Sequence, residues 1–153
     1  MKVNNVVLEI ADSLVDNIRR HGARAYPNEC CGALLGNGEP GEADKKVEAL
    51  LSLDNRSEGE AARTRFFLTA DDFRTAEKAA QEKGLILLGF YHSHPDHPAR
   101  PSDFDREHAL PWYSYIIVSV AHGEPQEATC WVLTDDRSRF LSEPMRAPAA
   151  SNS

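Results

Sequence analysis

Two histidines, a serine and an aspartate stand at close, fixed spacing in the middle of the chain. His92 and His94 end an apolar run, and Ser102 and Asp105 follow in a proline-bounded segment. A β-strand places residues two apart on one face, so both imidazoles can point at one spot. Two nitrogens and one carboxylate oxygen form a three-ligand set that leaves a fourth tetrahedral position for water, as in catalytic zinc sites. We therefore expect His92, His94 and Asp105 to bind zinc in a hydrolytic centre.

Each part of this pattern also has a simpler interpretation. A His-x-His pair alone is more often not a metal ligand, given the many roles of histidine. Ser102 and Asp105 fit a capping box at the start of a helix, which is compatible with ligation because a capped helix start holds Asp105 rigidly. His97 is an alternative ligand, ranked second because His92 and His97 would not share one face of a strand.

The order of these residues resembles the JAMM motif of the JAB/MPN metallopeptidases. His92-x-His94, seven residues and then Ser102-x-x-Asp105 follow a glutamate upstream, Glu29, and every position of the motif is filled. The resemblance extends from the helix before Glu29 to about residue 133. It implies that His92, His94 and Asp105 bind zinc, that Glu29 is the general acid/base, and that Ser102 helps to stabilise the oxyanion. Family members that have lost these residues are scaffolds, so the full set argues for catalysis.

Length and charge limit the other functions. With 153 residues, we expect one domain over residues 1–145 and a disordered tail at 146–153, which is rich in Ala, Pro and Ser. A net charge of −7 and the lack of a Lys/Arg cluster argue against nucleic acid as a partner. Because no run approaches the ~20 apolar residues of a membrane span, we expect a soluble, cytoplasmic protein.

The cysteines form a poor disulfide framework, since two of the three are adjacent, and this fits a reducing compartment. There is no Cys-x-x-Cys, so the cysteine-ligated zinc of nucleobase deaminases is not supported. Cys31, two residues from Glu29, is an alternative soft ligand or nucleophile. Its apolar neighbours instead favour a small buried side chain.

Hydrophobic periodicity predicts strands interleaved with helices. Strands are expected at residues 6–10, 30–35, 45–53, 65–68, 85–94, 113–120, 130–133 and 139–145, with 85–94 central in the sheet. Helices are expected up to about residue 24, at 70–83 and at 102–109, capped by Ser13 with Asp16, by Thr69 with Asp72, and by Ser102. Turns are expected at 36–41 and 122–125, and a surface loop at 54–63. This pattern indicates an α/β (α+β) fold, a mixed β-sheet flanked by helices, which the resemblance sharpens to a single JAB/MPN domain.

The resemblance also suggests a reaction and a substrate. Amide or isopeptide hydrolysis is the expected reaction, and small members without insertions resemble prokaryotic enzymes that trim the tail after the C-terminal Gly-Gly of ubiquitin-like sulfur-carrier proteins. A deubiquitinase-like isopeptidase is an alternative, disfavoured by the short loop at residues 54–63. A non-catalytic scaffold with a structural metal is another, although structural sites usually have four protein ligands. The carrier protein and the oligomeric state stay open.

Overall fold

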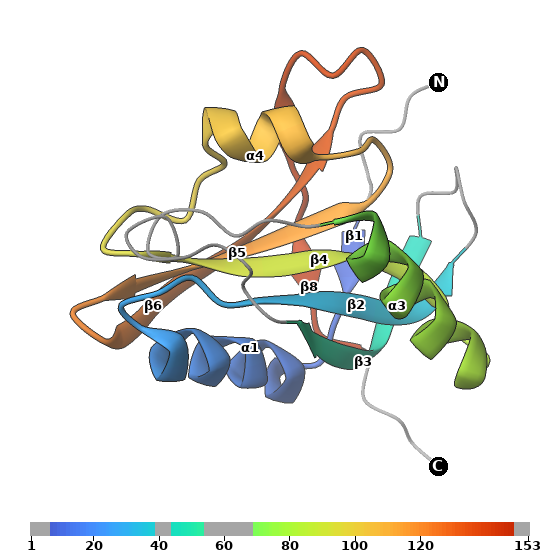
Figure 1. Cartoon of the computed structure of the whole chain (residues 1–153), viewed down its shortest axis with the longest axis horizontal. Coiled ribbons are helices and arrows are strands. Elements are labelled where there is room, and N and C mark those ends of the chain that lie inside the picture. Colours follow the sequence, from blue (N-terminus) through green and yellow to red (C-terminus); the bar gives the residue numbers. More distant parts are fainter. Residues whose placement is uncertain (1–6, 39–43, 54–68, 149–153) are drawn as a thin grey trace.

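One mixed β-sheet organises the protein, which is described by a computed structural model over residues 7–38, 44–53 and 69–148. Within these residues, the strands follow the order β7-β6-β5-β4-β2-β3-β1-β8 across the sheet. Their bounds are β1 Val7–Glu9, β2 Cys31–Gly38, β3 Asp44–Leu53, β4 Ile86–Pro95, β5 Ser114–Ala121, β6 Glu124–Leu133, β7 Phe140–Ser142 and β8 Met145–Arg146. The helices α1 (Asp12–Ala25), α3 (Ala70–Glu82) and α4 (Asp103–His108) flank the sheet (Figure 1).

Strand β4 lies in the middle of the sheet, as its apolar sequence predicted. It pairs in parallel with β5 and antiparallel with β2, and it is buried from Leu87 onward. Close packing at this centre requires glycine: a Cβ on Gly32 of β2 would lie 2.2 Å from the ring of Tyr91. A Cβ on Gly89 would lie 1.8 Å from the carbonyl oxygen of Ser114 on β5. The strand that ends in His92 and His94 is therefore held tightly on both sides.

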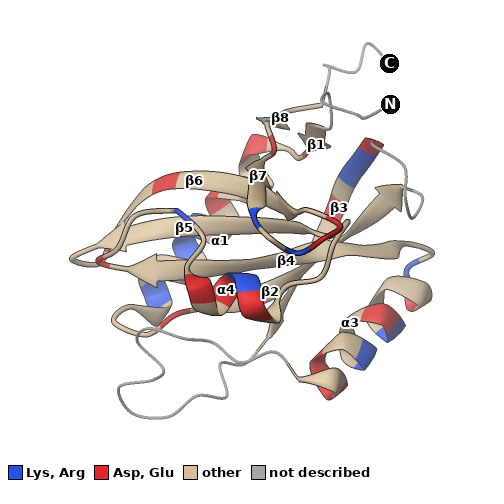
Figure 2. Cartoon of the chain, turned by 90° about the horizontal axis from the view of Figure 1, so that it is seen from above, with Lys and Arg blue, Asp and Glu red and all other residues tan. Residues whose placement is uncertain are grey.

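Two apolar cores cover the two faces of the sheet. Helix α1 packs Val15 and Ile18 into the first core, beside Leu34 and Tyr91. Helix α3 packs Ala76 and Ala80 into the second core, against Phe90. Figure 2 shows α3 and α4 on one face of the sheet and Lys, Arg, Asp and Glu dispersed over several elements. No helix among the described residues is long and apolar enough to cross a membrane.

The capping boxes of α3 and α4 form as predicted. In α3, Thr69 accepts a hydrogen bond from the backbone N–H of Asp72, whose carboxylate accepts from the backbone N–H of Thr69. In α4, Ser102 and Asp105 make the same reciprocal pair. Local sequence alone sets these two helix starts, because both partners lie within four residues.

The predicted cap of α1 is wrong. The helix begins at Asp12, before Ser13, and its N-cap Ala11 makes no side-chain hydrogen bond. The carbonyl oxygen of Ala11 accepts from the N–H groups of Leu14 and Val15. Burial of Ile10 and Val15 on the sheet fixes this start. A side-chain cap at Ser13 would contribute only about 1 kcal/mol, which is less than the burial of these two side chains contributes.

Several predicted strand limits also differ. Strand β2 continues to Gly38, through the region where a turn was expected from residue 36. Gly36 has no side chain, so its backbone can approach β3 closely. A Cβ at position 36 would lie 1.9 Å from the carbonyl oxygen of Lys46. Strand β6 begins at Glu124, so the turn expected over residues 122–125 is confined to His122 and Gly123, both with positive φ.

The strand expected at residues 139–145 is instead two strands on opposite edges of the sheet. Strand β7 pairs with β6, and β8 pairs with β1. Arg146, placed in the tail by the sequence prediction, belongs to β8. The strand expected at 65–68, the loop expected at 54–63 and the tail residues 149–153 lie outside the described residues.

Cys30 provides a test of this packing at alkaline pH. Burial raises the pKa of its thiol to about 11 from an ordinary value of 9.0. Between these values the unfolded chain loses this proton and the folded chain keeps it, so the free energy of unfolding falls as pH rises, by about 2–3 kcal/mol in all. In Cys30→Ala the decrease in the free energy of unfolding between pH 8 and 11 should be smaller by that amount, as measured by urea unfolding at pH 8, 9, 10 and 11. Equal slopes in the variant and the wild type would contradict this burial.

Candidate metal centre

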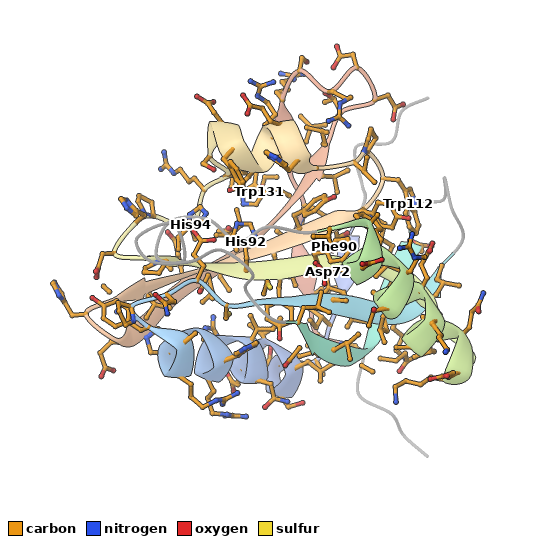
Figure 3. All side chains as sticks on the ribbon, viewed as in Figure 1. Asp72, Phe90, His92, His94, Trp112 and Trp131 are labelled. Atoms are coloured by element: carbon orange, nitrogen blue, oxygen red, sulfur yellow. The ribbon has the colours of Figure 1, made fainter. Side chains whose placement is uncertain are left out.

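The residues expected to bind metal meet between the sheet and α4. His92 and His94 point from the end of β4 toward α4 (Figure 3), which carries Asp105 in its first turn. Among the described residues, His92, His94 and Asp105 form a group whose ligand atoms all lie within 4.8 Å of one another. The His92 and His94 side chains are almost fully buried.

The distances within this group fit a tetrahedral zinc ion. The Nε2 atoms of His92 and His94 are 3.2 Å apart, and each lies 3.2 Å from an oxygen of Asp105. Ligands at the usual 2.0–2.1 Å from a tetrahedral zinc are separated from one another by about 3.3 Å. His92 is nearest to Oδ1 of Asp105 and His94 to Oδ2, so the two nitrogens and the carboxylate already lie at about the separations that zinc ligation requires.

A backbone carbonyl orients the ring of His94. Its Nδ1 lies 2.9 Å from the carbonyl oxygen of Pro98. Because a carbonyl oxygen can only accept, Nδ1 carries a hydrogen, which leaves Nε2, facing the ligand cluster, as the nitrogen that would bind the metal. Hydrogen bonds of this kind fix the tautomer and raise the basicity of metal-binding histidines.

The capping box of α4 orients Asp105. The backbone N–H of Ser102 donates to Oδ2 of Asp105 over 2.8 Å, and the backbone N–H of Asp105 donates to Oγ of Ser102 over 3.0 Å. The hydroxyl of Ser102 acts as an acceptor in this pair, so its own hydrogen can be donated outward from its exposed position. One local motif therefore positions both a ligand and a hydrogen-bond donor.

Electrostatics favour a carboxylate beside the imidazoles. Burial lowers the pKa of His92, but the charge and hydrogen bond of Asp105 and the charge of Glu29 raise it, and the net shift is upward. Burial raises the pKa of Asp105, but His92, His94 and the N–H of Ser102 hold it well below its usual range. The cluster therefore stabilises a positive charge at its centre, which is also where a metal ion would sit.

Glu29 lies beside the histidines and outside the ligand group of the described residues. It is 4% exposed and precedes β2, where Cys31 pairs with His92. Ser93, between the two histidines, ties the strands together: its Oγ accepts from the N–H of Cys30 over 2.8 Å, and its N–H donates to the carbonyl oxygen of Cys30 over 3.2 Å. This role of Ser93 was not predicted, because nothing in the local sequence pattern marks it.

The alternative ligands lie outside the same group. The carbonyl oxygen of His97 accepts a hydrogen bond from the hydroxyl of Ser119. Among the described residues, the imidazole ring of His97 does not belong to the group of possible metal ligands. The thiol of Cys31 is buried and donates to the carbonyl oxygen of Leu53 over 3.5 Å. The ring of His108 stacks on the ring of Phe104, with 4.1 Å between the ring centroids.

A mainly apolar pocket adjoins the ligands between α4 and the sheet. His92 and Asp105 form part of its wall, and aromatic rings of Phe104, Tyr115 and Phe140 supply much of the rest. Apolar walls limit the access of water, and charge interactions are stronger in such surroundings than in bulk solvent.

Metal content tests the three-ligand set. The purified protein should hold one zinc per chain, and His94→Ala should lose it because one of three protein ligands is removed. His97→Ala is the matched control, since only the backbone of His97 makes a contact described above, and it should keep the metal. Elemental analysis after expression with adequate zinc gives the result; zinc retained in His94→Ala and lost in His97→Ala would reassign the ligand.

Comparison with known proteins adds relatives of similar length. A desampylase from Haloferax volcanii is 30% identical over 116 residues, which cover 75% of this chain and 79% of that protein. A probable TtuB-protein conjugate cleaving protease from Thermus thermophilus is 32% identical over 114 residues, covering 74% and 71%.

Solved structures share the fold. The solution structure of a protein from Salinibacter ruber is 48% identical, with a TM-score of 0.71, and covers 92% of this chain and 91% of its own. A JAB1/MPN domain protein from Archaeoglobus fulgidus shares the fold at 18% identity, with a TM-score of 0.55 over 90% and 98% of the two chains. A sequence model of the prokaryotic homologs of the JAB domain matches residues 11–134. The chain therefore belongs to the prokaryotic JAB-domain family, and both the predicted family and the predicted mixed α/β fold are confirmed.

Proposed function

We propose that this protein is a zinc-dependent metallopeptidase of the JAMM type, which hydrolyses the amide or isopeptide bond after the C-terminal Gly-Gly of a ubiquitin-like sulfur-carrier protein. The observation that carries this proposal is the cluster of His92, His94 and Asp105, in which the two Nε2 atoms are 3.2 Å apart and each lies 3.2 Å from a carboxylate oxygen, with a buried glutamate beside it. Relatives named as a desampylase and as a TtuB-conjugate cleaving protease support the same class of reaction.

The roles of the residues follow from the chemistry that each can perform. Zinc held by these three ligands supplies Lewis-acid activation and lowers the pKa of water toward about 7. Glu29 accepts the proton of the attacking water and delivers it to the leaving amine. Ser102 donates its hydroxyl hydrogen to the oxyanion of the tetrahedral intermediate, and such a donor contributes about 3 kcal/mol in other hydrolases.

The burial of the ligands suits a substrate with no side chains near the cut. His92 is 2% exposed and His94 is 7% exposed, so the scissile bond must approach a recessed centre. Glycine offers no side chain to clash there, and an extended Gly-Gly tail can bring its carbonyl group close to the ligands. Selectivity then depends on the residues that flank the cut.

We place the reaction in the cytoplasm. The three cysteines of the chain are buried thiols outside any disulfide bond, as expected of a protein that works in a reducing compartment. The net charge of −7 and the dispersed basic residues argue for a protein substrate and against nucleic acid.

Two alternatives differ from this proposal in testable ways. A non-catalytic scaffold with a structural metal calls for a fourth protein ligand, whereas the group found among the described residues has three members. A deubiquitinase-like isopeptidase calls for surfaces that grip ubiquitin, and the loop at residues 54–63 that bears on this lies outside the described residues.

The experiment is incubation with ubiquitin-like sulfur carriers extended past Gly-Gly, followed by intact-mass analysis. The wild type should release the residues after Gly-Gly. Glu29→Gln should keep zinc and lose turnover by about 10²–10⁴-fold, because it removes the proton acceptor while leaving the ligands in place. Replacing the second glycine of the carrier by a bulky residue should reduce kcat/KM far more than changes on the carrier's distant surface.

Different failures point to different errors. Loss of zinc in Glu29→Gln would make Glu29 a ligand and overturn the assigned roles. Equal cleavage of glycine-free peptides, or cutting of ubiquitin chains without action on extended carriers, would reject the substrate and leave the zinc hydrolase intact.

A further inference from the structure

The loop between β4 and α4 is bonded to the sheet through three successive carbonyl groups. The hydroxyl of Ser119 on β5 donates to the carbonyl oxygen of His97 over 2.6 Å. The hydroxyl of Thr129 on β6 donates to the carbonyl oxygen of Ala99, also over 2.6 Å. Between them, the carbonyl oxygen of Pro98 accepts from Nδ1 of His94 over 2.9 Å. Two hydroxyls on the sheet thus fix the residues on either side of the one carbonyl that orients a proposed metal ligand.

We infer that Ser119 and Thr129 are positioning residues that hold the Pro98 carbonyl group against Nδ1 of His94 and so orient the ring of His94. Both side chains are partly or wholly buried on strands, where a hydroxyl without a hydrogen bond would be costly. Their bonds to the flanking carbonyl groups restrain the direction in which the carbonyl of Pro98 points. Without these restraints the loop can shift, the Nδ1–H of His94 can lose its acceptor, and the ring can turn away from the ligand cluster.

Further contacts hold the same arrangement. Nε1 of Trp131, labelled in Figure 3, donates to Oγ1 of Thr129 over 2.8 Å, so that the hydroxyl of Thr129 directs its own hydrogen to the loop. At the start of the loop, Asp96 has a φ of 58° and its N–H donates to the carbonyl oxygen of Val120 over 2.7 Å. The carboxylate of Asp96 accepts from the hydroxyl of Tyr26 over 2.6 Å. The loop is therefore fixed at its beginning and along its length.

This inference rests on the metal centre proposed above, but its test can be read without metal. The double variant Ser119→Ala/Thr129→Val removes both hydroxyls and keeps similar side-chain volumes. Nitrogen–proton NMR spectra of the histidine rings, recorded without metal, report whether the Nδ1 proton of His94 is held in a hydrogen bond and protected from exchange with water. Competition with a chromophoric chelator reports the dissociation constant for zinc.

The wild type should show a hydrogen-bonded, protected Nδ1 proton on His94. The double variant should lose this protection and bind zinc about ten-fold more weakly, at the lower end of the effect usual for groups that orient metal ligands. Thr129→Ser keeps a hydroxyl and should behave as the wild type. The matched control is Ser114→Ala, which removes a buried hydroxyl from the same strand β5, where it donates to Glu143 over 2.7 Å. It should leave both the protection of the Nδ1 proton and the zinc affinity unchanged.

Three results would overturn the inference: an unchanged protection of the His94 Nδ1 proton in the double variant, loss of that protection in Thr129→Ser, or an equal loss of zinc affinity in Ser114→Ala. If the double variant does not fold, Ser119→Ala and Thr129→Val are measured singly against the same criteria. A wild type that binds no zinc would reject the proposed metal centre, while the spectra of the Nδ1 proton would still decide the role of the two hydroxyls.

Discussion

The structure depends on holding one carboxylate against two buried imidazoles. Burial alone disfavours charge on His92 and on Asp105, yet the pKa of the imidazole is raised and that of the carboxyl is lowered, so mutual attraction prevails over burial. Such an arrangement persists only where neighbouring groups prevent the side chains from separating. The capping box of α4 restrains the carboxylate, and the Pro98 carbonyl group restrains the second imidazole, that of His94.

The rest of the fold supplies a rigid support for these restraints. Strand β4 has neighbours on both sides. Gly32 of β2 leaves room for the ring of Tyr91 on β4, and Gly89 of β4 lets the backbone of β5 approach closely. Ser93 joins this strand to the segment that carries Glu29, so the proposed base and the proposed ligands move together. A hydrolytic centre needs this rigidity because small displacements of a base from its substrate reduce the rate steeply.

Local sequence predicted those parts of the fold and site that local interactions decide. The capping pair of Ser102 with Asp105 and the apolar run of β4 were predicted from residues that are close in the chain. The start of α1 was missed because burial of Ile10 outweighs a side-chain cap at Ser13, and strands β7 and β8 were merged because their partners lie far away in sequence. The carbonyl group that orients His94 could not be predicted at all, since every residue has one and only the folded loop selects Pro98.

Zinc K-edge X-ray absorption on the zinc-loaded protein tests the central claim most directly, because it reports the atoms bound to the metal. The account predicts four nitrogen or oxygen neighbours at about 2.0–2.1 Å, with the scattering pattern of two imidazoles and no sulfur. A sulfur neighbour at about 2.3 Å, which would implicate Cys31, or the pattern of three imidazoles, which would implicate His97, would contradict the three-ligand centre with an open fourth position.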